Sequence, residues 1–175
     1  MHDIWWTALK GCRTVVEIGC GFGVVLKQMT ERGYEAHGVD IFQPYLDYVN
    51  VVAPGATWEC ADGRAWCDTQ ADCSWDAVMM IDFIEHIPHD IGAETIEHAQ
   101  RIAKHAVIME TPSGYMPQEA IEGFHIGTPG VPDMLNPHQK HVCGWEPAEL
   151  EALGFRCVLQ PGNRGYDRIY AAWNR

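Results

Sequence analysis

Residues 14–23 read TVVEIGCGFG, and this short stretch decides the fold. Its apolar first half predicts a buried strand over residues 14–18, and its alternate glycines predict a turn over residues 19–23. Residues 24–32 are typical of a helix, and Gly33 suits the position just past the end of that helix. A strand, a glycine-rich turn and a helix in this order form the first half of a parallel β-α-β unit.

The same alternation of strands and helices continues along the chain. Further strands are predicted over residues 35–39, 57–60, 75–81, 106–109, 155–160 and 168–173, and further helices over residues 44–49, 90–104 and 146–154. We expect Asp90 to cap the helix that follows it. The chain therefore predicts a single α/β domain over residues 1–175, with a Rossmann-like, mostly parallel seven-stranded sheet, helices on both faces and the last strand antiparallel.

Charge and cysteine content exclude several classes of protein. The chain has 12 Lys and Arg against 24 Asp and Glu, a net charge of −12, which argues against binding to nucleic acid or to an anionic membrane surface. Seven cysteines without a CxxC pair indicate free thiols, and no apolar run approaches about 18 residues. We expect a cytoplasmic monomer or homodimer with no nucleic-acid or membrane partner.

The glycine turn combines small residues with a carboxylate. Gly19, Gly21 and Gly23 allow a ligand to approach the backbone closely, but their G-x-G-x-G spacing lacks the strict G-x-G-x-x-G of dinucleotide-binding turns. Glu17, two residues before the first glycine, would repel a pyrophosphate and attract an ammonium group. A ligand with a positively charged amino-acid end therefore fits this turn better than a dinucleotide does.

Two further acidic residues follow the next two predicted strands. Asp40 ends the second strand, where a carboxylate can accept both hydroxyls of a ribose, and Asp62 follows the third, where it can accept an adenine amine. The carboxyl ends of parallel strands are where open α/β sheets bind their ligands. The alternative is that the glycines only form a tight turn and that both aspartates are solvated loop residues.

The motifs together resemble those of class I S-adenosylmethionine-dependent methyltransferases of the small-molecule type. VVEIGCGFG (15–23) resembles their first motif, GVDIF (38–42) their ribose-binding motif, CADGRAW (60–66) their adenine-side motif, and WDAVMMIDFIEHI (75–87) their fourth motif. VIMETPSGY (107–115) and NPHQKHVCGWEPAELEALGF (136–155) resemble a bacterial and archaeal subgroup of uncertain substrate. The resemblance covers about residues 13–173.

This resemblance implies methyl transfer from S-adenosylmethionine to an oxygen or nitrogen nucleophile of a small-molecule acceptor, with S-adenosylhomocysteine as product. The cofactor-binding residues that it implies are Glu17, Gly19, Cys20, Gly21, Gly23, Asp40, Ile41, Asp62, Gly63, Ile81 and Asp82. Two alternatives remain open: a non-catalytic module that binds S-adenosylmethionine, and a nicotinamide-dependent oxidoreductase, against which the glycine spacing and Glu17 argue.

A hydroxyl acceptor needs help to lose its proton, and a histidine is the side chain best suited to accept it near neutral pH. His86 lies just past the fourth predicted strand, beside the expected methyl donor, and is the candidate catalytic residue. Glu85, Tyr115, His138 and His141 are the candidate substrate-binding residues.

Residues 111–145 form a long segment rich in proline and glycine, which we predict to be a substrate-side loop. Three roles remain open for the part of this segment that holds His138, His141 and Cys143: a lid over the substrate, a metal site, or an inert surface loop. A closed zinc site needs four ligands from two spaced pairs, and only His125 offers a fourth, so the sequence assigns no metal ligand.

Residues 1–12 are predicted to be a short N-terminal extension, because the first strand begins at residue 14. Trp5 and Trp6 within it suggest either a small interface patch or the remnant of a lid. The sequence does not choose between these two roles.

Overall fold

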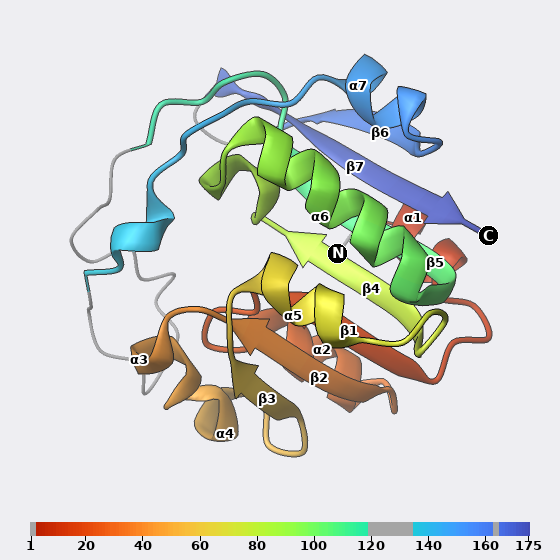
Figure 1. The fold of residues 1–175 in the computed structure, drawn as a ribbon, viewed down its shortest axis with the longest axis vertical. Coiled ribbons are helices and arrows are strands. Elements are labelled where there is room, and N and C mark those ends of the chain that lie inside the picture. Colours follow the sequence, from red (N-terminus) through yellow and green to blue (C-terminus); the bar gives the residue numbers. More distant parts are fainter. Residues whose placement is uncertain (1–2, 119–134, 163–164) are drawn as a thin grey trace.

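The computed structural model describes residues 3–118, 135–162 and 165–175, and a seven-stranded sheet forms its centre (Figure 1). The strands are β1 (Thr14–Ile18), β2 (Glu35–Asp40), β3 (Thr57–Cys60), β4 (Trp75–Ile81), β5 (Ala103–Pro112), β6 (Arg156–Pro161) and β7 (Asp167–Asn174). The helices are α1 (Asp3–Ala8), α2 (Val24–Glu31), α3 (Gln43–Leu46), α4 (Val49–Val52), α5 (Gly63–Thr69), α6 (His89–Ile102) and α7 (Pro147–Ala152), with short 3-10 turns η1 (Ile84–His86) and η2 (Pro137–Gln139).

The strand order is β3-β2-β1-β4-β5-β7-β6. The pairs β1–β2, β2–β3, β1–β4 and β4–β5 are parallel, whereas β7 is antiparallel to both of its neighbours, β5 and β6. The predicted sheet is therefore confirmed, including the single reversed strand at the end of the chain.

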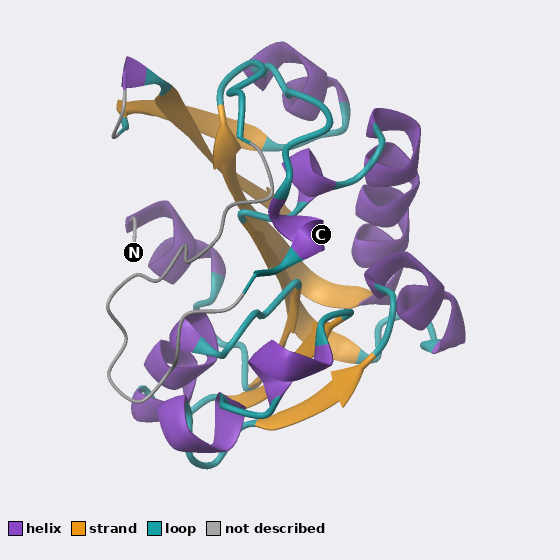
Figure 2. Ribbon diagram, turned by 90° about the vertical axis from the view of Figure 1, so that its left-hand side faces the viewer, coloured by secondary structure: helices purple, strands orange, loops and turns teal. Residues whose placement is uncertain are grey.

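Both faces of the sheet are covered by helices (Figures 1 and 2). In β4, Val78 and Met80 pack into the cluster that contains residues of α5, α6 and α7, while Ala77 and Met79 pack into the cluster that contains residues of α1 and α2. Because successive side chains of a strand point to opposite faces, a strand buried on both sides is apolar at almost every position. This explains the continuous apolar run that marked residues 75–81 in the sequence.

The structure corrects several predicted helix boundaries. α6 begins at His89 with Pro88 at its N-cap, so Asp90 lies in the first turn and does not cap the helix. The helix ends at Ile102, because Ala103 already pairs with Trp75 in the sheet. The helix expected over residues 44–49 is two separate turns, α3 and α4. The sequence did not predict α5, which Asp62 caps by accepting a hydrogen bond from the backbone N–H of Ala65 (2.9 Å).

Helix α1 contributes buried residues to the core that covers the sheet. α1 packs against β5 and β7, and Trp5 within it is only 2% exposed. This burial excludes Trp5 from an interface patch or a lid. The guanidinium of Arg32 lies over the ring of Trp6, 4.3 Å from its centre.

The described parts of the segment 111–145 pair with each other across the carboxyl ends of the strands. The N–H of Gly114 donates to the carbonyl of Trp145 (2.8 Å), and the N–H of His141 donates to the carbonyl of Gln118 (2.9 Å). The N–H of Val142 donates to the carbonyl of Glu85 in η1 (2.9 Å), which fixes this segment against the end of β4. Within the described ranges, no helix is long and apolar enough to cross a bilayer.

Candidate active site at the carboxyl ends of the strands

A pocket of about 410 Å³ lies at the carboxyl ends of β1 and β4. The glycine turn, the first turn of α2, the end of β4 and the two arms of the segment 111–145 form its walls. Eight of the residues predicted from the sequence line it: Glu17, Gly19, Cys20, Gly21, Ile81, Asp82, His86 and His141.

A smaller pocket of about 160 Å³ lies beside the first, at the ends of β2 and β3. Five other predicted residues line it: Asp40, Ile41, Asp62, Gly63 and His138. Gly19, Asp82 and His86 belong to the walls of both pockets, so the two pockets are neighbours. The structure thus brings the acidic ends of β1, β2 and β3 together as predicted.

Glu17 is a buried carboxylate at the base of the larger pocket. Its side chain is only 3% exposed, and among the described residues its Oε2 atom has no hydrogen-bond partner. Burial, with a smaller contribution from Asp40, raises the pKa of Glu17 well above its ordinary value. A buried carboxylate oxygen without a donor is costly, so this position favours a ligand that brings a cation or an N–H group.

Asp40 holds the glycine turn to the end of β2. Its Oδ2 accepts from the N–H of Gly21 and its Oδ1 from the N–H of Phe42, both at 2.8 Å. Burial raises the pKa of Asp40, and these two N–H groups oppose that rise. Each carboxylate oxygen has more than one lone pair, so both can still accept from a ligand hydroxyl.

Two of the predicted glycines are required by packing as well as by the pocket. A Cβ atom on Gly19, which has φ +77°, would lie 2.5 Å from Cδ2 of Phe83. A Cβ atom on Gly63 would lie 2.4 Å from Cγ2 of Ile18. A side chain at position 19 would therefore clash with Phe83, and one at position 63 would push α5 away from Ile18 of β1.

Asp82 follows β4 with φ +50°, an uncommon backbone conformation for a residue other than glycine. It forms an ion pair with Arg168, whose Nε also donates to Glu110 Oε1 at 2.6 Å. Burial by itself would lower the pKa of Arg168, but the two carboxylates outweigh it and raise that pKa above its ordinary value. Arg168 lines the larger pocket, and the sequence did not predict it as a site residue. No local sequence pattern predicts this position of Arg168, because it depends on the pairing of β7 with β5, which sets Arg168 opposite Pro112.

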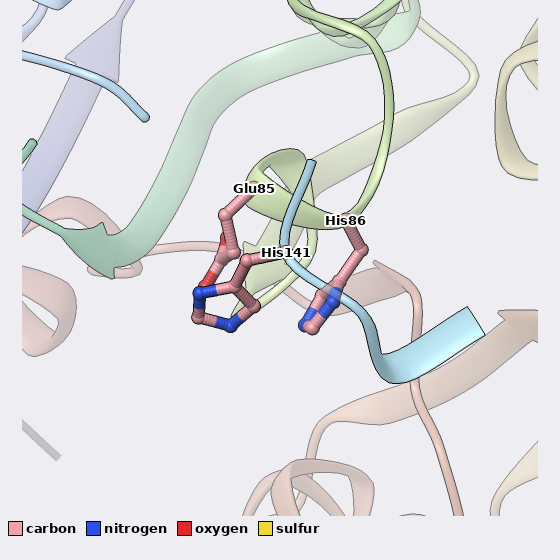
Figure 3. A group of neighbouring side chains, drawn as sticks. All are labelled: Glu85, His86 and His141. Atoms are coloured by element: carbon pink, nitrogen blue, oxygen red, sulfur yellow. The ribbon is translucent and has the colours of Figure 1, made fainter. Parts of the chain in front are cut away.

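Glu85, His86 and His141 converge beside the larger pocket (Figure 3). One ligand-type atom from each lies within 4.8 Å of the others, and the two imidazole rings are 4.7 Å apart in an edge-to-face arrangement. Glu85 is 2% exposed; its Oε2 accepts from the Thr111 hydroxyl (3.0 Å), whereas among the described residues Oε1 has no partner.

Burial governs the protonation of this group. It lowers the pKa of His86 to about 4, with the neighbouring His141 adding to the effect, and it also lowers the pKa of His141. It raises the pKa of Glu85 well above its ordinary value, and Asp82 adds to that rise. Both imidazoles are therefore neutral near pH 7.

Other predicted residues lie apart from this group. Tyr115 is 53% exposed, its hydroxyl donates to the His141 carbonyl (3.4 Å), and it lies outside the walls of both pockets. His138 lies near Phe42 in the smaller pocket, away from His141. The thiol of Cys143 faces the carbonyls of Ile84 and Ile87 at 3.3 and 3.2 Å. His125 lies outside the described residues.

Comparisons with known proteins place the chain in a family. Residues 15–106, more than half of the chain, match the family described as a methyltransferase domain. Ubiquinone biosynthesis O-methyltransferases from Alkalilimnicola ehrlichii and Idiomarina loihiensis are each 29% identical, over 84 and 80 residues that make up 46% and 43% of this chain. The matches cover 34% and 32% of those proteins, so they span about a third of their length.

Solved structures share the fold. A SAM-dependent methyltransferase from Archaeoglobus fulgidus superposes with a TM-score of 0.70 at 20% identity, over 98% of this chain and 90% of that one. Magnesium protoporphyrin IX methyltransferase from Synechocystis PCC 6803, with bound SAM, superposes with a TM-score of 0.64 at 19% identity, over 98% and 75%. The cofactor is S-adenosylmethionine and the product S-adenosylhomocysteine, as the resemblance implied. The chain belongs to the class I S-adenosylmethionine-dependent methyltransferases, and not to the nicotinamide-dependent oxidoreductases.

Proposed function

We propose that this chain, as one domain over residues 1–175, transfers the methyl group of S-adenosylmethionine to an oxygen or nitrogen atom of a small-molecule acceptor. One observation carries this proposal: a single pocket joins the buried carboxylate of Glu17, whose Oε2 has no partner among the described residues, to the imidazoles of His86 and His141. The first suits the charged amino-acid end of the cofactor, and the second suits the acceptor.

The residues around the two pockets fit the cofactor. Glu17 Oε2 would accept from its ammonium group, and Gly19, Cys20 and Gly21 would border its methionine chain without large side chains. Gly23, the N-cap of α2, lies outside the walls of both pockets and would act by shaping this turn. Asp40 and Ile41 would hold the ribose, and Asp62 with Gly63 the adenine, in the smaller pocket. Ile81 and Asp82 would lie between these two parts, at the end of β4.

The bound cofactor supplies a methyl group activated by a positively charged sulfur. The chain has to place the acceptor atom in line with that methyl group and exclude water. We assign this role to His86 and His141, supported from behind by Glu85. Tyr115 would act through the backbone of His141, and His138 would close the nucleoside side.

A neutral imidazole with a pKa of about 4 is a weak base at pH 7. His86 by itself would therefore assist an amine acceptor, which needs little help, more effectively than a hydroxyl acceptor. A hydroxyl acceptor requires a further group that favours loss of its proton.

The proposal is tested by incubating the protein with methyl-labelled S-adenosylmethionine and panels of small alcohols, phenols, hydroxy acids and amines. We expect transfer to at least one panel, and His86→Ala to lower it by roughly 100-fold, because a shift of about 1 Å in the position of an acceptor can cost about 10²-fold in rate. Calorimetry should show that the variant still binds S-adenosylhomocysteine, because Glu17, Asp40 and the glycine turn are unchanged.

His98→Ala is the matched control, because His98 pairs with Asp68 far from the pocket. It should retain full activity. Label that enters only protein or RNA substrates would contradict a small-molecule acceptor. Full activity of His86→Ala on the same acceptor would contradict the assignment of the acceptor side.

A further inference from the structure

We propose that Glu85, His86 and His141 bind a divalent first-row transition-metal ion, such as Zn²⁺ or Mn²⁺, which faces the acceptor pocket. The site itself stands on the geometry of these three residues. Its role in methyl transfer, the activation of a hydroxyl acceptor, rests on the proposed function.

The three residues supply a set of ligands that such ions prefer. Two imidazole nitrogens and one carboxylate oxygen are common ligands of zinc and of neighbouring metals in open, reactive sites. Here one such atom from each residue already lies within 4.8 Å of the others, so small side-chain rotations bring all three to a single ion. Figure 3 shows that the three side chains come from two segments, η1 and the chain after η2, and extend toward the same region.

A buried oxygen atom of Glu85 independently indicates that a cation binds here. The Glu85 side chain is fully buried, Thr111 occupies Oε2, and among the described residues Oε1 has no partner. The nearby cation Arg168 already pairs with Asp82 and Glu110. A bound cation would satisfy Oε1, which otherwise keeps the full cost of burial without a hydrogen bond.

The histidines are held as metal ligands usually are. Nδ1 of His86 lies 3.2 Å from the carbonyl of Lys140, and Nδ1 of His141 lies 2.8 Å from the carbonyl of Met116. A carbonyl only accepts, so each Nδ1 carries the proton and the lone pair falls on Nε2. Ligating histidines typically donate their other N–H to a backbone carbonyl in this way.

Three protein ligands leave at least one position of the ion open, as in catalytic zinc sites. Both histidines line the 410 Å³ pocket, so the open position faces the space assigned to the acceptor. A hydroxyl group bound to such an ion has a lowered pKa and releases its proton to solvent near neutral pH. Its oxygen then bonds to the methyl carbon as the carbon–sulfur bond breaks, which leaves a neutral thioether. We therefore infer that the acceptor is an alcohol or a phenol.

The site is tested by titrating metal-free protein with Zn²⁺, and separately with Mn²⁺, in a calorimeter. Wild-type protein should bind one ion per chain. His86→Ala, His141→Ala and Glu85→Gln should each weaken binding by at least about 10-fold. Glu85→Gln keeps the shape of the side chain and its contact with Thr111, so it serves as the informative variant if a histidine variant fails to fold.

His138→Ala and Cys143→Ser are the matched controls, because these residues belong to the metal set that the sequence spacing suggested. Both should retain wild-type metal affinity. The proposal is overturned if wild-type protein binds neither ion up to millimolar concentration, or if Glu85→Gln and both histidine variants bind as wild type does. Loss of binding in the controls alone would also overturn it.

A second measurement separates the site from the proposed function. Removing the ion should abolish transfer to hydroxyl acceptors and leave the affinity for S-adenosylhomocysteine unchanged. Equal transfer to a hydroxyl acceptor with and without the ion would overturn its role in activation. Normal binding of both the ion and S-adenosylhomocysteine with no transfer to any small molecule would instead contradict the proposed function.

Discussion

Glu17 is a residue whose environment is poor for folding and good for binding a cation. Its carboxylate is buried beside Asp40, and its pKa is raised because water cannot solvate the charge there. A ligand ammonium group would remove much of this unfavourable interaction. The free energy lost on burying the carboxylate is then recovered when the cofactor binds.

Glu17→Gln is therefore expected to stabilise the cofactor-free protein and to weaken cofactor binding. The folded state holds the proton of Glu17 more tightly than the unfolded chain does, so stability falls as pH rises from about 4.5 toward the folded-state pKa. The variant lacks this fall and should gain roughly 1–3 kcal/mol above that pKa. Denaturant unfolding across this pH range measures the gain.

The same variant should bind S-adenosylmethionine roughly 10- to 100-fold more weakly, since hydrogen bonds to charged groups contribute about 1.5–3 kcal/mol. Glu97→Gln, at an exposed position of α6, is the control and should change neither property. Unchanged cofactor affinity in Glu17→Gln would show that this carboxylate does not contact the ammonium group.

At the scale of elements, the glycine turn connects β1 to α2 and forms part of the pocket wall. Gly21 precedes α2 and Gly33 follows it, and both have positive φ, at +54° and +85°. A Cβ atom on Gly21 would point toward Tyr45, another wall residue, at 3.9 Å, whereas one on Gly33 would meet nothing within 4 Å. The two positions therefore share a backbone requirement but differ in their distance from the pocket.

Gly21→Val and Gly33→Val should lower the free energy of unfolding by similar amounts, about 1–2 kcal/mol, because both force a branched residue into the left-handed region. Only Gly21→Val should lose binding of S-adenosylhomocysteine. Thermal melts and calorimetry on the two variants check this. Comparable binding by both variants would remove the turn from the cofactor site; if either valine variant does not fold, the alanine pair gives the same comparison.

The short element η1 explains why a distant loop reaches the site. The carbonyl of Glu85 accepts from the N–H groups of Val142 and Cys143 at 2.9 and 3.4 Å. Trp145 is buried, and its Nε1 donates to the Ile84 carbonyl at 3.3 Å. These bonds fix the chain around residue 141 against the end of β4, and they place His141 beside His86.

At the scale of the whole molecule, the sheet mixes segments from both ends of the chain. α1 packs on β5 and β7, and β7 lies between β5 and β6. Neither α1 nor β7 can therefore leave without breaking sheet pairing or core packing. This arrangement favours cooperative unfolding of the domain as one unit.

We expect a single thermal transition whose midpoint rises with S-adenosylhomocysteine. A ligand at about 100 times its Kd adds about 2.7 kcal/mol of stability, which corresponds to roughly 5–10 °C for a chain of this size. NAD at the same concentration should leave the midpoint unchanged. Two separate transitions, or a shift with NAD and none with S-adenosylhomocysteine, would contradict the single cofactor-binding domain.

Local sequence was sufficient for the elements that depend on neighbouring residues. The strand of residues 14–18, the glycine turn and α2 follow from apolar pattern and backbone freedom, which are properties of adjacent positions. The positions of Glu17, Asp40 and Asp62 at one edge followed as well, because parallel strands end together. α5 escaped prediction because its seven residues are too few to show a clear helical period.

The chain's sequence by itself thus determined the fold class, the family and the cofactor, since each depends on short motifs in a fixed order. Only the tertiary structure decided which distant side chains meet. It paired Asp82 with Arg168 and joined Glu85 and His86 to His141, whereas it turned the thiol of Cys143 to the carbonyl of Ile84 and placed His138 near Phe42. The physical reason is that these meetings depend on strand register and on hydrogen bonds between segments more than 50 residues apart, which leave no periodic trace in the sequence.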